Sequence, residues 1–578
     1  MTSGRSSTLR RVGPYAIAGA AGLAVIVAAV LVVARIDRSP QCGVSLKVTS
    51  STEKDNLLTK LAEAYNAKKR RLPSGDCAKA EVDGFTSGAA MDALAGGWTS
   101  DEARKHPKPH VWLPTSSMWA VQLREHDGYR DLPTDSSSIA RSPVVIAMPR
   151  KMAEAIGWEQ GKPFTWKEIL GRDGSTWEKL GNREWGRFAY AKDDPTRSTS
   201  GLAATVATYY AGAGKGRDLQ PGDVTSPKVE EFVRNVEANI LFHPPDIMNF
   251  LKDLSDADKQ NRAENYISAV VMQEELAYLY NEGNPDGDPS IVGRSSQPNM
   301  QLVAIHPAEG TLVLDHPYII LPSVTAVERE AATSFRDFLL EPEQREWFAK
   351  LGFRDDRDVP PPDLAKSLGF SVGHRPSLME DPSAKVLDAI RSGWKRLSKR
   401  ANVLVIVDES GSMKESSGIP GFSTRMDAAK AALRNNMKRL NPDDEVGLWA
   451  FASYPGTPYR TLLAPTRFGN QGEAFSKAID RLRIAEAPYD DTALCVTIRN
   501  AHRYMLEHLK EESINAIVVL TDGVNDYPQD PCQMSTLGTQ LADADRTHQV
   551  KVFGIGFGAD AEGGMLVLKQ VSKGPYLN

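Results

Sequence analysis

Three oxygen-bearing side chains follow a short apolar run in the second half of the sequence. Residues 403–407 read Val-Leu-Val-Ile-Val, and Asp408, Ser410 and Ser412 come directly after them, with Gly411 permitting a tight turn. Such an unbroken, largely β-branched run is typical of a strand buried on both faces of a parallel sheet, and ligands bind where the strands of such sheets end. The oxygens are hard ligands and only one is a carboxylate, which favours a small, partly hydrated cation such as Mg²⁺.

Two later stretches supply further oxygens to the same predicted edge. Residues 515–520 form another apolar strand, which ends at Thr521 and Asp522, and Thr492 opens a helical pattern between the two strands. Parallel strands joined by helices bring such loops to one edge of a sheet. We therefore expect five residues to converge around Mg²⁺ or Mn²⁺: Asp408, Ser410, Ser412, Thr492 and Asp522. The alternative is a serine-rich cap of the following helix, in which Thr492 and Asp522 play no part.

From about residue 400 to the end, the sequence resembles the von Willebrand factor A (VWA) family. The metal-ion-dependent adhesion site of that family has the pattern Asp-x-Ser-x-Ser, a later Thr, and an Asp after a central strand, and these residues match it. The resemblance implies a doubly wound, Rossmann-like domain over residues 401–578. It also implies direct or near-direct metal ligation by Ser410, Ser412 and Thr492, with Asp408 and Asp522 balancing charge directly or through water. An open position on the ion would then accept a carboxylate from a protein partner.

Two features depart from the family pattern. Residues 489–491 read Tyr-Asp-Asp, where the family often has Gly-Gly before the threonine, and this extra acid could tighten metal binding or repel an acidic partner. One helical segment, 561–571, follows the strand predicted at 550–556, whereas the family normally adds a last helix that couples the site to distant surfaces. The same strand carries Gly-Ile-Gly-Phe-Gly, which does not match the dinucleotide-binding spacing Gly-x-Gly-x-x-Gly.

Length and composition indicate a globular protein with several domains. The chain has 578 residues, of which 41% are apolar and 25% are charged, and a formal net charge of −5. A chain of this length exceeds what one core usually holds, and the negative balance gives no reason to expect nucleic acid as a partner.

Residues 15–34 contain no charged side chain, and twenty helical residues span roughly 30 Å, about one hydrocarbon core. Arg5, Arg10 and Arg11 precede the stretch, which weakly favours a cytoplasmic N-terminus over residues 1–14. We expect an uncleaved single-pass membrane anchor with the bulk of the chain outside the cytoplasm. A cleaved signal peptide is the alternative.

The four cysteines fall into two pairs, one in each half of the chain. Cys42 and Cys77 flank one stretch, and Cys495 and Cys532 flank another. One pair per predicted domain suits disulfides in an oxidising compartment, and each would close a loop of just under forty residues. Four free thiols in a reducing compartment are the alternative.

The first half of the chain repeats a strand, a hydroxyl-rich loop and a helix three times, at residues 44–65, 78–96 and 110–117 onward. This order, with the apolar stretch 142–149 where the chain would cross between lobes, resembles the type 2 bacterial extracellular solute-binding proteins over residues 43–355. The resemblance implies two α/β lobes that close on a solute. Candidate contacts are Ser50, Ser51, Ser87, Ser116, Ser117, Thr196, Ser198 and Ser200, and the alternative is that these residues only cap helices.

Residues 356–400 are predicted to contain a Pro-rich linker and an amphipathic helix at 383–399.

We find no motif of a serine hydrolase, a phosphate-binding loop or a zinc protease, and therefore expect no enzyme activity. The leading hypothesis is a membrane-anchored protein of the cell envelope that binds a protein partner through a Mg²⁺-dependent site and carries a solute-binding-like module. One alternative is a transporter-type solute receptor docked through its VWA domain. Another is a chaperone-like role in cytoplasmic metal insertion, and the predicted anchor and the cysteine pairs argue against this second alternative.

Overall fold

The computed structural model describes residues 42–557, apart from gaps at 134–135, 159–162, 241–243, 245, 262, 420, 438–439, 471, 511–512, 524, 528–531 and 545–549. Within this described part, no helix combines the length and the apolar character needed to cross a bilayer. The predicted anchor at 15–34 and the predicted helical segment at 561–571 lie outside it.

The N-terminal module begins with a mostly parallel sheet in the order β2-β1-β3-β9. Its strands are β1 (Val44–Ser50), β2 (Ala78–Gly84), β3 (Val111–Leu113) and the antiparallel β9 (Ile319–Ile320). The helices of this lobe are α2 (Asp55–Lys68), α3 (Ser87–Ala95), α4 (Ser100–Lys105), α5 (Ser117–Leu123), α14 (Ala326–Leu339) and α15 (Pro342–Lys350). The first three strands each lead through a polar loop into a helix, as the sequence predicts.

A second lobe is built on the sheet β5-β6-β4-β7, with β8 paired to β4. Its strands are β4 (Ser142–Pro149), β5 (Tyr190–Ala191), β6 (Ala269–Gln273), β7 (Leu302–Ile305) and β8 (Val313–Leu314). Its helices are α6 (Arg150–Ala155), α7 (Trp166–Leu170), α8 (Thr176–Lys179), α9 (Thr199–Ala213), α10 (Pro221–Val224), α11 (Pro227–Ala238), α12 (Ile247–Lys259) and α13 (Glu274–Asn281). Strand β4 is buried along its whole length, because both of its faces pack against apolar side chains.

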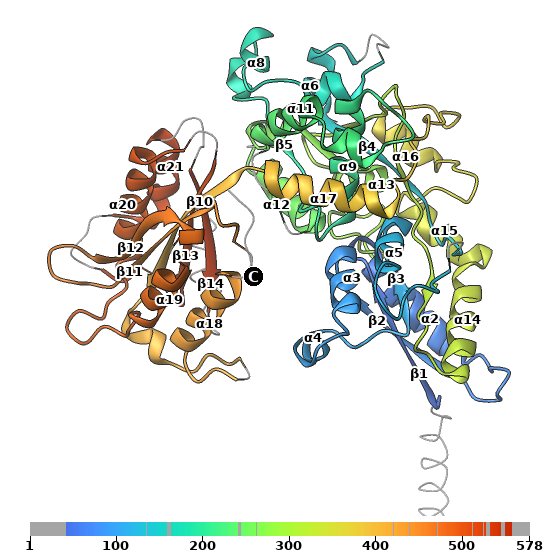
Figure 1. Cartoon of the computed structure of the whole chain (residues 1–578), viewed down its shortest axis with the longest axis horizontal. Helices are drawn as coiled ribbons and strands as arrows, with labels where there is room; N and C mark the ends of the chain where they lie inside the picture. Colours follow the sequence, from blue (N-terminus) through green and yellow to red (C-terminus); the bar gives the residue numbers. More distant parts are fainter. Residues whose placement is uncertain are drawn as a thin grey trace, which may run out of the picture.

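The segment predicted as a linker contains two packed helices, α16 (Pro362–Leu368) and α17 (Ala384–Leu397). Leu364 and Leu368 of α16 are buried in the core of the N-terminal module. Helix α17 crosses both lobes: Arg391 donates a 2.7 Å hydrogen bond to Gln122 of α5, and Trp394 donates one of 3.1 Å to Glu237 of α11. Figure 1 shows α17 lying along the module before the chain enters β10.

Helix α17 is held on the lobes mainly by its apolar face. Val386, Leu387 and Ile390 are buried and belong to the same hydrophobic cluster as Trp119 of one lobe and Tyr209 of the other. A β-carbon at Gly393 would lie 2.4 Å from the Tyr209 hydroxyl, so only glycine permits this close approach. The amphipathic pattern at 383–399 thus packs on both lobes at once.

The C-terminal domain is a five-stranded sheet in the order β12-β11-β10-β13-β14, parallel except for β12. Its strands are β10 (Arg400–Asp408), β11 (Glu445–Phe451), β12 (Tyr459–Arg467), β13 (Ser513–Thr521) and β14 (Val550–Gly556). Its helices are α18 (Arg425–Met437), α19 (Gly472–Asp480), α20 (Leu494–Glu507) and α21 (Met534–Ala544).

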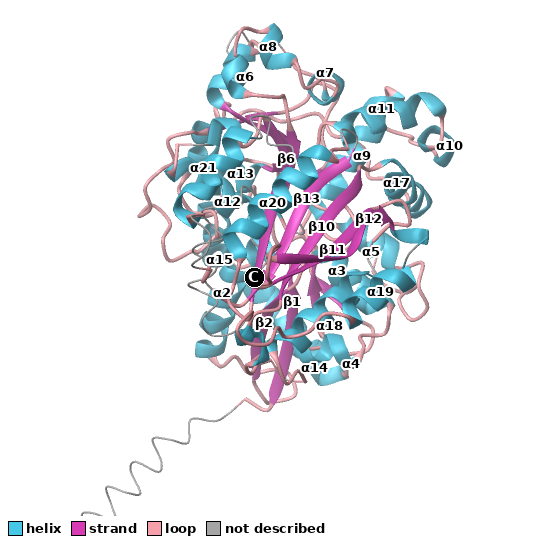
Figure 2. Cartoon of the chain, turned by 90° about the vertical axis from the view of Figure 1, so that its left-hand side faces the viewer, coloured by secondary structure: helices cyan, strands magenta, loops and turns pink. Residues whose placement is uncertain are grey.

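Alternate residues of the central strand β10 face opposite cores. Leu404 and Ile406 pack with α20 and α21, whereas Val405 and Val407 pack with α18 and α19. Figure 2 shows the helices on both sides of this sheet. This doubly wound arrangement places the carboxyl ends of β10 and β13 next to each other, because the two strands pair in parallel up to Val407 and Leu520.

Candidate metal centre and solute cleft

Three loops meet at the carboxyl edge of the C-terminal sheet. The backbone nitrogen of Gly411, after β10, donates a 2.9 Å hydrogen bond to the carbonyl of Asp490, in the loop before α20. The carbonyl of Thr492 in that same loop accepts a 3.0 Å bond from the nitrogen of Asp526, after β13. These backbone bonds join the three loops that the sequence predicts to converge.

Gly411 lies close to the side chain of Asp490. A β-carbon built on Gly411 would lie 2.9 Å from a carboxylate oxygen of Asp490, a separation that side chains essentially never adopt. The absence of a side chain at Gly411 therefore lets the loop after β10 approach Asp490 without displacing its carboxylate.

The predicted metal-site oxygens lie within hydrogen-bond distance of one another. The hydroxyls of Ser410 and Ser412 are 3.1 Å apart, and the Ser412 hydroxyl donates a 2.8 Å hydrogen bond to Asp522 Oδ1. The hydroxyls of Thr492 and Ser412 flank Gly523, at 3.6 and 3.9 Å from the position of a β-carbon there. Asp522 and Asp408 are both buried.

This donor set fits a small divalent cation. Adjacent ligands of an octahedral Mg²⁺ lie about 2.9 Å apart, because its bonds to oxygen are about 2.0–2.1 Å long. The two oxygen separations of 3.1 and 2.8 Å, which are hydrogen bonds here, permit that spacing. The described residues contain no group of three or more His, Cys, Asp or Glu side chains arranged to hold a metal, so hydroxyls would have to supply most of the ligands.

Asp408 has a different place in the cluster from Asp522. Its two carboxylate oxygens accept hydrogen bonds from the backbone nitrogen of Ser410, at 2.8 Å, and from the hydroxyl of Thr521, at 2.5 Å. Burial raises the pKa of Asp408 to about 6, against the hydrogen bonds from Thr521 and Ser410, which lower it. Asp408 thus orients the loop that carries both serines and adds negative charge beneath it.

Two charged residues of the site were not predicted from the sequence. Arg425, at the start of α18, donates a 2.7 Å hydrogen bond to Asp522 Oδ2 and is itself buried. Glu409 is buried beside Asp408, and it accepts hydrogen bonds from Arg460 Nη2 at 2.6 Å and from the Tyr454 hydroxyl at 2.5 Å. Glu409 thereby fixes the neighbouring loops. No sequence signal separates these residues from ordinary surface charges.

Both predicted disulfides are present. Cys42 is bonded to Cys77, and Cys495 is bonded to Cys532. The second bridge joins α20, which begins just after Thr492, to the chain after β13, so it connects two walls of the candidate metal site.

We expect the double replacement Cys495→Ala and Cys532→Ala to destabilise the C-terminal domain by about 4 kcal/mol, because the bridge closes a long loop in the unfolded chain. Thermal unfolding followed by calorimetry measures this change. The pair Cys42→Ala and Cys77→Ala is the control, since its bridge lies in the N-terminal module. An unchanged C-terminal transition in the first variant would show that the bridge does not contribute.

The hydroxyls predicted to contact a solute are bonded within the protein. Ser51 donates to Glu53 at 2.7 Å, Ser87 and Thr115 are 3.2 Å apart, and Thr196 donates to Asp194 at 2.7 Å. The other predicted contact residues are also hydrogen-bonded within the protein or buried. Ser50 donates to the Ser51 carbonyl, Ser116 caps α5, and Ser117 bonds Asp315. Ser198 and Ser200 are buried at the start of α9.

The two lobes contact each other directly at these loops. The nitrogen of Gly88 donates a 2.7 Å hydrogen bond to the Arg197 carbonyl, and the Trp119 indole donates one of 2.7 Å to the Thr199 hydroxyl. A β-carbon at Gly88 would lie 2.4 Å from the Thr196 carbonyl. The structure therefore brings Ser87 and Thr196 together in a closed contact between the lobes.

Asp193, on the second lobe beside this contact, is fully buried. Burial raises the pKa of Asp193 to about 8, although the Ser198 hydroxyl lowers it. The folded protein therefore holds Asp193 protonated below pH 8, whereas the unfolded chain ionises it above about pH 4. Stability contributed by this group is complete below pH 4 and decreases as the pH rises toward 8.

We expect Asp193→Asn to remove this pH dependence. Near pH 4 the variant and the wild type should have similar stability, whereas toward pH 8 the variant should become more stable by up to about 1.4 kcal/mol per pH unit. Denaturant unfolding at pH 4, 6 and 8 measures the difference, with the exposed Asp388→Asn as control. A wild type that is as stable as the variant at pH 8 would contradict the expectation.

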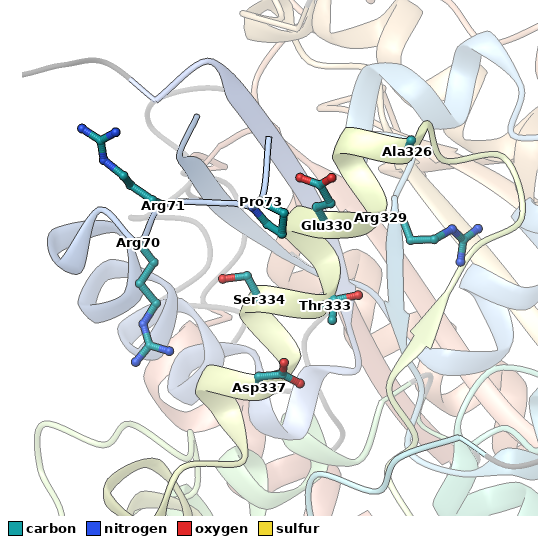
Figure 3. Close-up of a pocket in the computed structure, with 9 residues that line it drawn as sticks. All are labelled: Arg70, Arg71, Pro73, Ala326, Arg329, Glu330, Thr333, Ser334 and Asp337. Atoms are coloured by element: carbon teal, nitrogen blue, oxygen red, sulfur yellow. The ribbon is translucent and has the colours of Figure 1, made fainter. Parts of the chain in front are cut away.

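Of the cavities that border the N-terminal module, two are the most spacious of those described. One, of about 930 Å³, is lined by Asp92, Thr196, Arg197 and Trp394, among others, where the lobe contact meets α17. The other, of about 700 Å³, lies between the chain after α2 and helix α14 (Figure 3). Its arginines, Arg70, Arg71 and Arg329, point in different directions, so they form no convergent anion site.

Two families match the chain. Residues 46–354, more than half of the chain, match the family described as bacterial extracellular solute-binding protein, and residues 403–525 match the von Willebrand factor type A domain. The protein thus combines two modules. It belongs to the bacterial extracellular solute-binding protein family and carries a VWA domain after the solute-binding domain.

Two relatives match most of this chain. These are the uncharacterized protein Rv1836c of Mycobacterium tuberculosis strain H37Rv and the uncharacterized protein MT1884 of strain CDC 1551. Each is 25% identical to this chain over 537 residues, and the match covers 89% of this chain and 71% of the relative. Among solved structures, a periplasmic thiamin binding protein has a TM-score of 0.37 at 11% identity, covering 62% of this chain and 96% of its own. The SpRpn10 VWA domain has a TM-score of 0.22 at 17% identity, covering 30% and 82%.

Proposed function

We propose that this chain is a membrane-anchored protein of the cell envelope that binds a protein partner through a Mg²⁺-dependent VWA site. Ser410, Ser412 and Thr492 would hold the ion, Asp408 and Asp522 would balance its charge, and a carboxylate of the partner would complete its coordination. The observation that carries the proposal is the convergence of hydroxyl and carboxylate oxygens from three loops, with separations of 3.1 and 2.8 Å.

Exposed apolar side chains next to the site support a protein as the partner. Tyr489 is 44% exposed and precedes Asp490, which bonds Gly411. Ile419 and Phe422 are 45% and 37% exposed on the loop that leads from Glu415 to Arg425. Large exposed apolar side chains are typical of protein interfaces.

The anchor and the compartment are part of the same proposal. The uncharged stretch 15–34 would hold the protein in the membrane, with the described residues outside the cytoplasm. The two disulfides support this placement, because they persist in oxidising compartments. We propose a binding role rather than a catalytic one, because the sequence carries no motif of a serine hydrolase, a phosphate-binding loop or a zinc protease.

The test is retention of a cell-envelope protein on the immobilised full-length chain. We expect wild type to retain a partner in Mg²⁺ and to release it in chelator, and Ser412→Ala to retain at least about tenfold less, because a ligand is lost. Thr466→Ala, on β12, is the matched control. Equal retention in chelator would contradict the proposal.

A transporter-type solute receptor is the second candidate, favoured by the family match of residues 46–354. Native mass spectrometry of the purified protein tests it, since a receptor is expected to retain a small molecule. Thr196→Val should then weaken retention, because Thr196 lines the cavity of about 930 Å³. The position of α17 across both lobes favours the adhesive proposal, because receptors of this kind open and close around their solute.

A further inference from the structure

One carboxylate of the candidate metal site is already paired with a cation of the protein. Arg425 is 5% exposed, and its Nη1 lies 2.7 Å from Asp522 Oδ2. The other oxygen of Asp522 accepts the Ser412 hydroxyl at 2.8 Å. Asp522 thus lies between the serine that would bind an ion and the guanidinium of Arg425.

A second contact fixes Arg425 in this position. Its backbone nitrogen donates a 2.9 Å bond to the Glu415 carbonyl, and its Nη2 lies 3.0 Å from a carboxylate oxygen of Glu415. Arg425 also begins α18, and the packing of Met426 and Ala429 holds this helix against the sheet. The guanidinium is therefore positioned by its helix and by the loop before it.

Without a divalent ion, the site needs this cation. Asp408 and Asp522 are both buried, and burying a carboxylate without a counter-ion is strongly unfavourable. Arg425 makes a charged hydrogen bond to Asp522 in the described residues, and it remains protonated at every physiological pH. Its charge also lies next to the position that a divalent cation would occupy, and like charges repel.

We propose that Arg425 is a built-in counter-cation of the site. It compensates Asp522 and keeps the domain folded when no metal is bound, and it competes with the divalent ion for that carboxylate. The competition rests on the proposed metal-dependent function, whereas the compensation does not. Arg425 is a positioning residue, and it sets the metal affinity below what the oxygens alone would give.

The experiment compares full-length wild type, Arg425→Gln and Arg425→Lys, with Arg434→Gln as control. Arg434 lies on the same helix and pairs with Asp480 at the surface. Calorimetric unfolding in EDTA measures compensation, and titration with Mn²⁺ measures competition. In EDTA we expect Arg425→Gln to lower the unfolding midpoint of the C-terminal domain by about 10 °C, because a buried charge loses its partner. We expect Arg425→Lys to restore most of this loss.

If Arg425 competes with the metal, Arg425→Gln should strengthen Mn²⁺ binding, although it weakens folding in EDTA. Arg425→Gln should bind Mn²⁺ about tenfold more tightly than wild type, because the repelling charge is gone. Mn²⁺ should also raise the unfolding midpoint of this variant more than that of wild type. An Arg425→Gln variant that unfolds like Arg434→Gln in EDTA would overturn the compensation. A folded Arg425→Gln that binds Mn²⁺ more weakly than wild type would overturn the competition.

A double variant covers the case in which Arg425→Gln does not fold. Arg425→Gln with Asp522→Asn leaves neither charge uncompensated, so it should unfold at a higher temperature in EDTA than Arg425→Gln alone. A double variant that is no more stable overturns the inference. If neither wild type nor Arg425→Gln binds Mn²⁺, the proposed function and the competition are both contradicted, and the EDTA measurements alone decide on compensation.

Discussion

Replacing Asp522 by asparagine is expected to reduce the affinity of the full-length protein for Mn²⁺ by about 100-fold, or roughly 2.7 kcal/mol. The variant keeps the shape of the side chain and an oxygen for the Ser412 hydroxyl, but it removes one of the two carboxylates among the predicted metal-site residues. The charge of Arg425 then lies beside the ion without compensation, which further opposes metal binding. Isothermal titration with Mn²⁺ measures the effect.

The matched control for this replacement is Asp480→Asn. Asp480 also pairs with an arginine of α18, but it is 60% exposed and lies away from the three loops. We expect its Mn²⁺ affinity to equal that of wild type. Equal affinity of Asp522→Asn and wild type would show that the oxygens of these loops do not hold the ion.

The second large effect is expected from helix α17. Leu387 and Ile390 are fully buried between the two lobes, and their joint replacement by alanine should destabilise the N-terminal module by about 5 kcal/mol, because it leaves a cavity on both lobes. We also expect the lobes to separate, since α17 connects α5 to α11. Small-angle scattering measures the separation, and limited proteolysis measures the exposure of residues 384–397.

Asp388→Ala is the control for this experiment, because Asp388 lies on the exposed face of the same helix. It should leave scattering and proteolysis unchanged. If the double replacement leaves both unchanged as well, then α17 does not hold the lobes together. The closed contact between Gly88 and Arg197 would in that case be sufficient by itself.

The convergence of the candidate metal-site residues could be predicted because each follows a recognisable strand or opens a helix. The apolar run 403–407 and the run 515–520 identify neighbouring parallel strands, and their ends place Asp408 and Asp522 at one edge. Arg425 and Glu409 could not be predicted, because their roles depend on which side chains the fold places opposite them. Their sequence neighbours give no periodic signal for burial.

The solute-binding domain shows a different limit of sequence reasoning. The serines and threonines after its strands were predicted as solute contacts, and the order of elements supports the family. Whether a hydroxyl faces a solute or a neighbouring side chain depends on how far the lobes close, and Ser51 and Thr196 bond within the protein here. The pattern of 383–399 predicted an amphipathic helix. That it packs on both lobes follows from contacts distant in sequence, such as Arg391 with Gln122.

The most direct measurement of the central claim is anomalous diffraction from crystals of the protein soaked in Mn²⁺. The proposal predicts an anomalous peak bonded to the hydroxyls of Ser410 and Ser412 and next to Asp522, with Thr492 on its other side, and no such peak in Asp522→Asn. A peak located elsewhere, or none at saturating Mn²⁺, would contradict it.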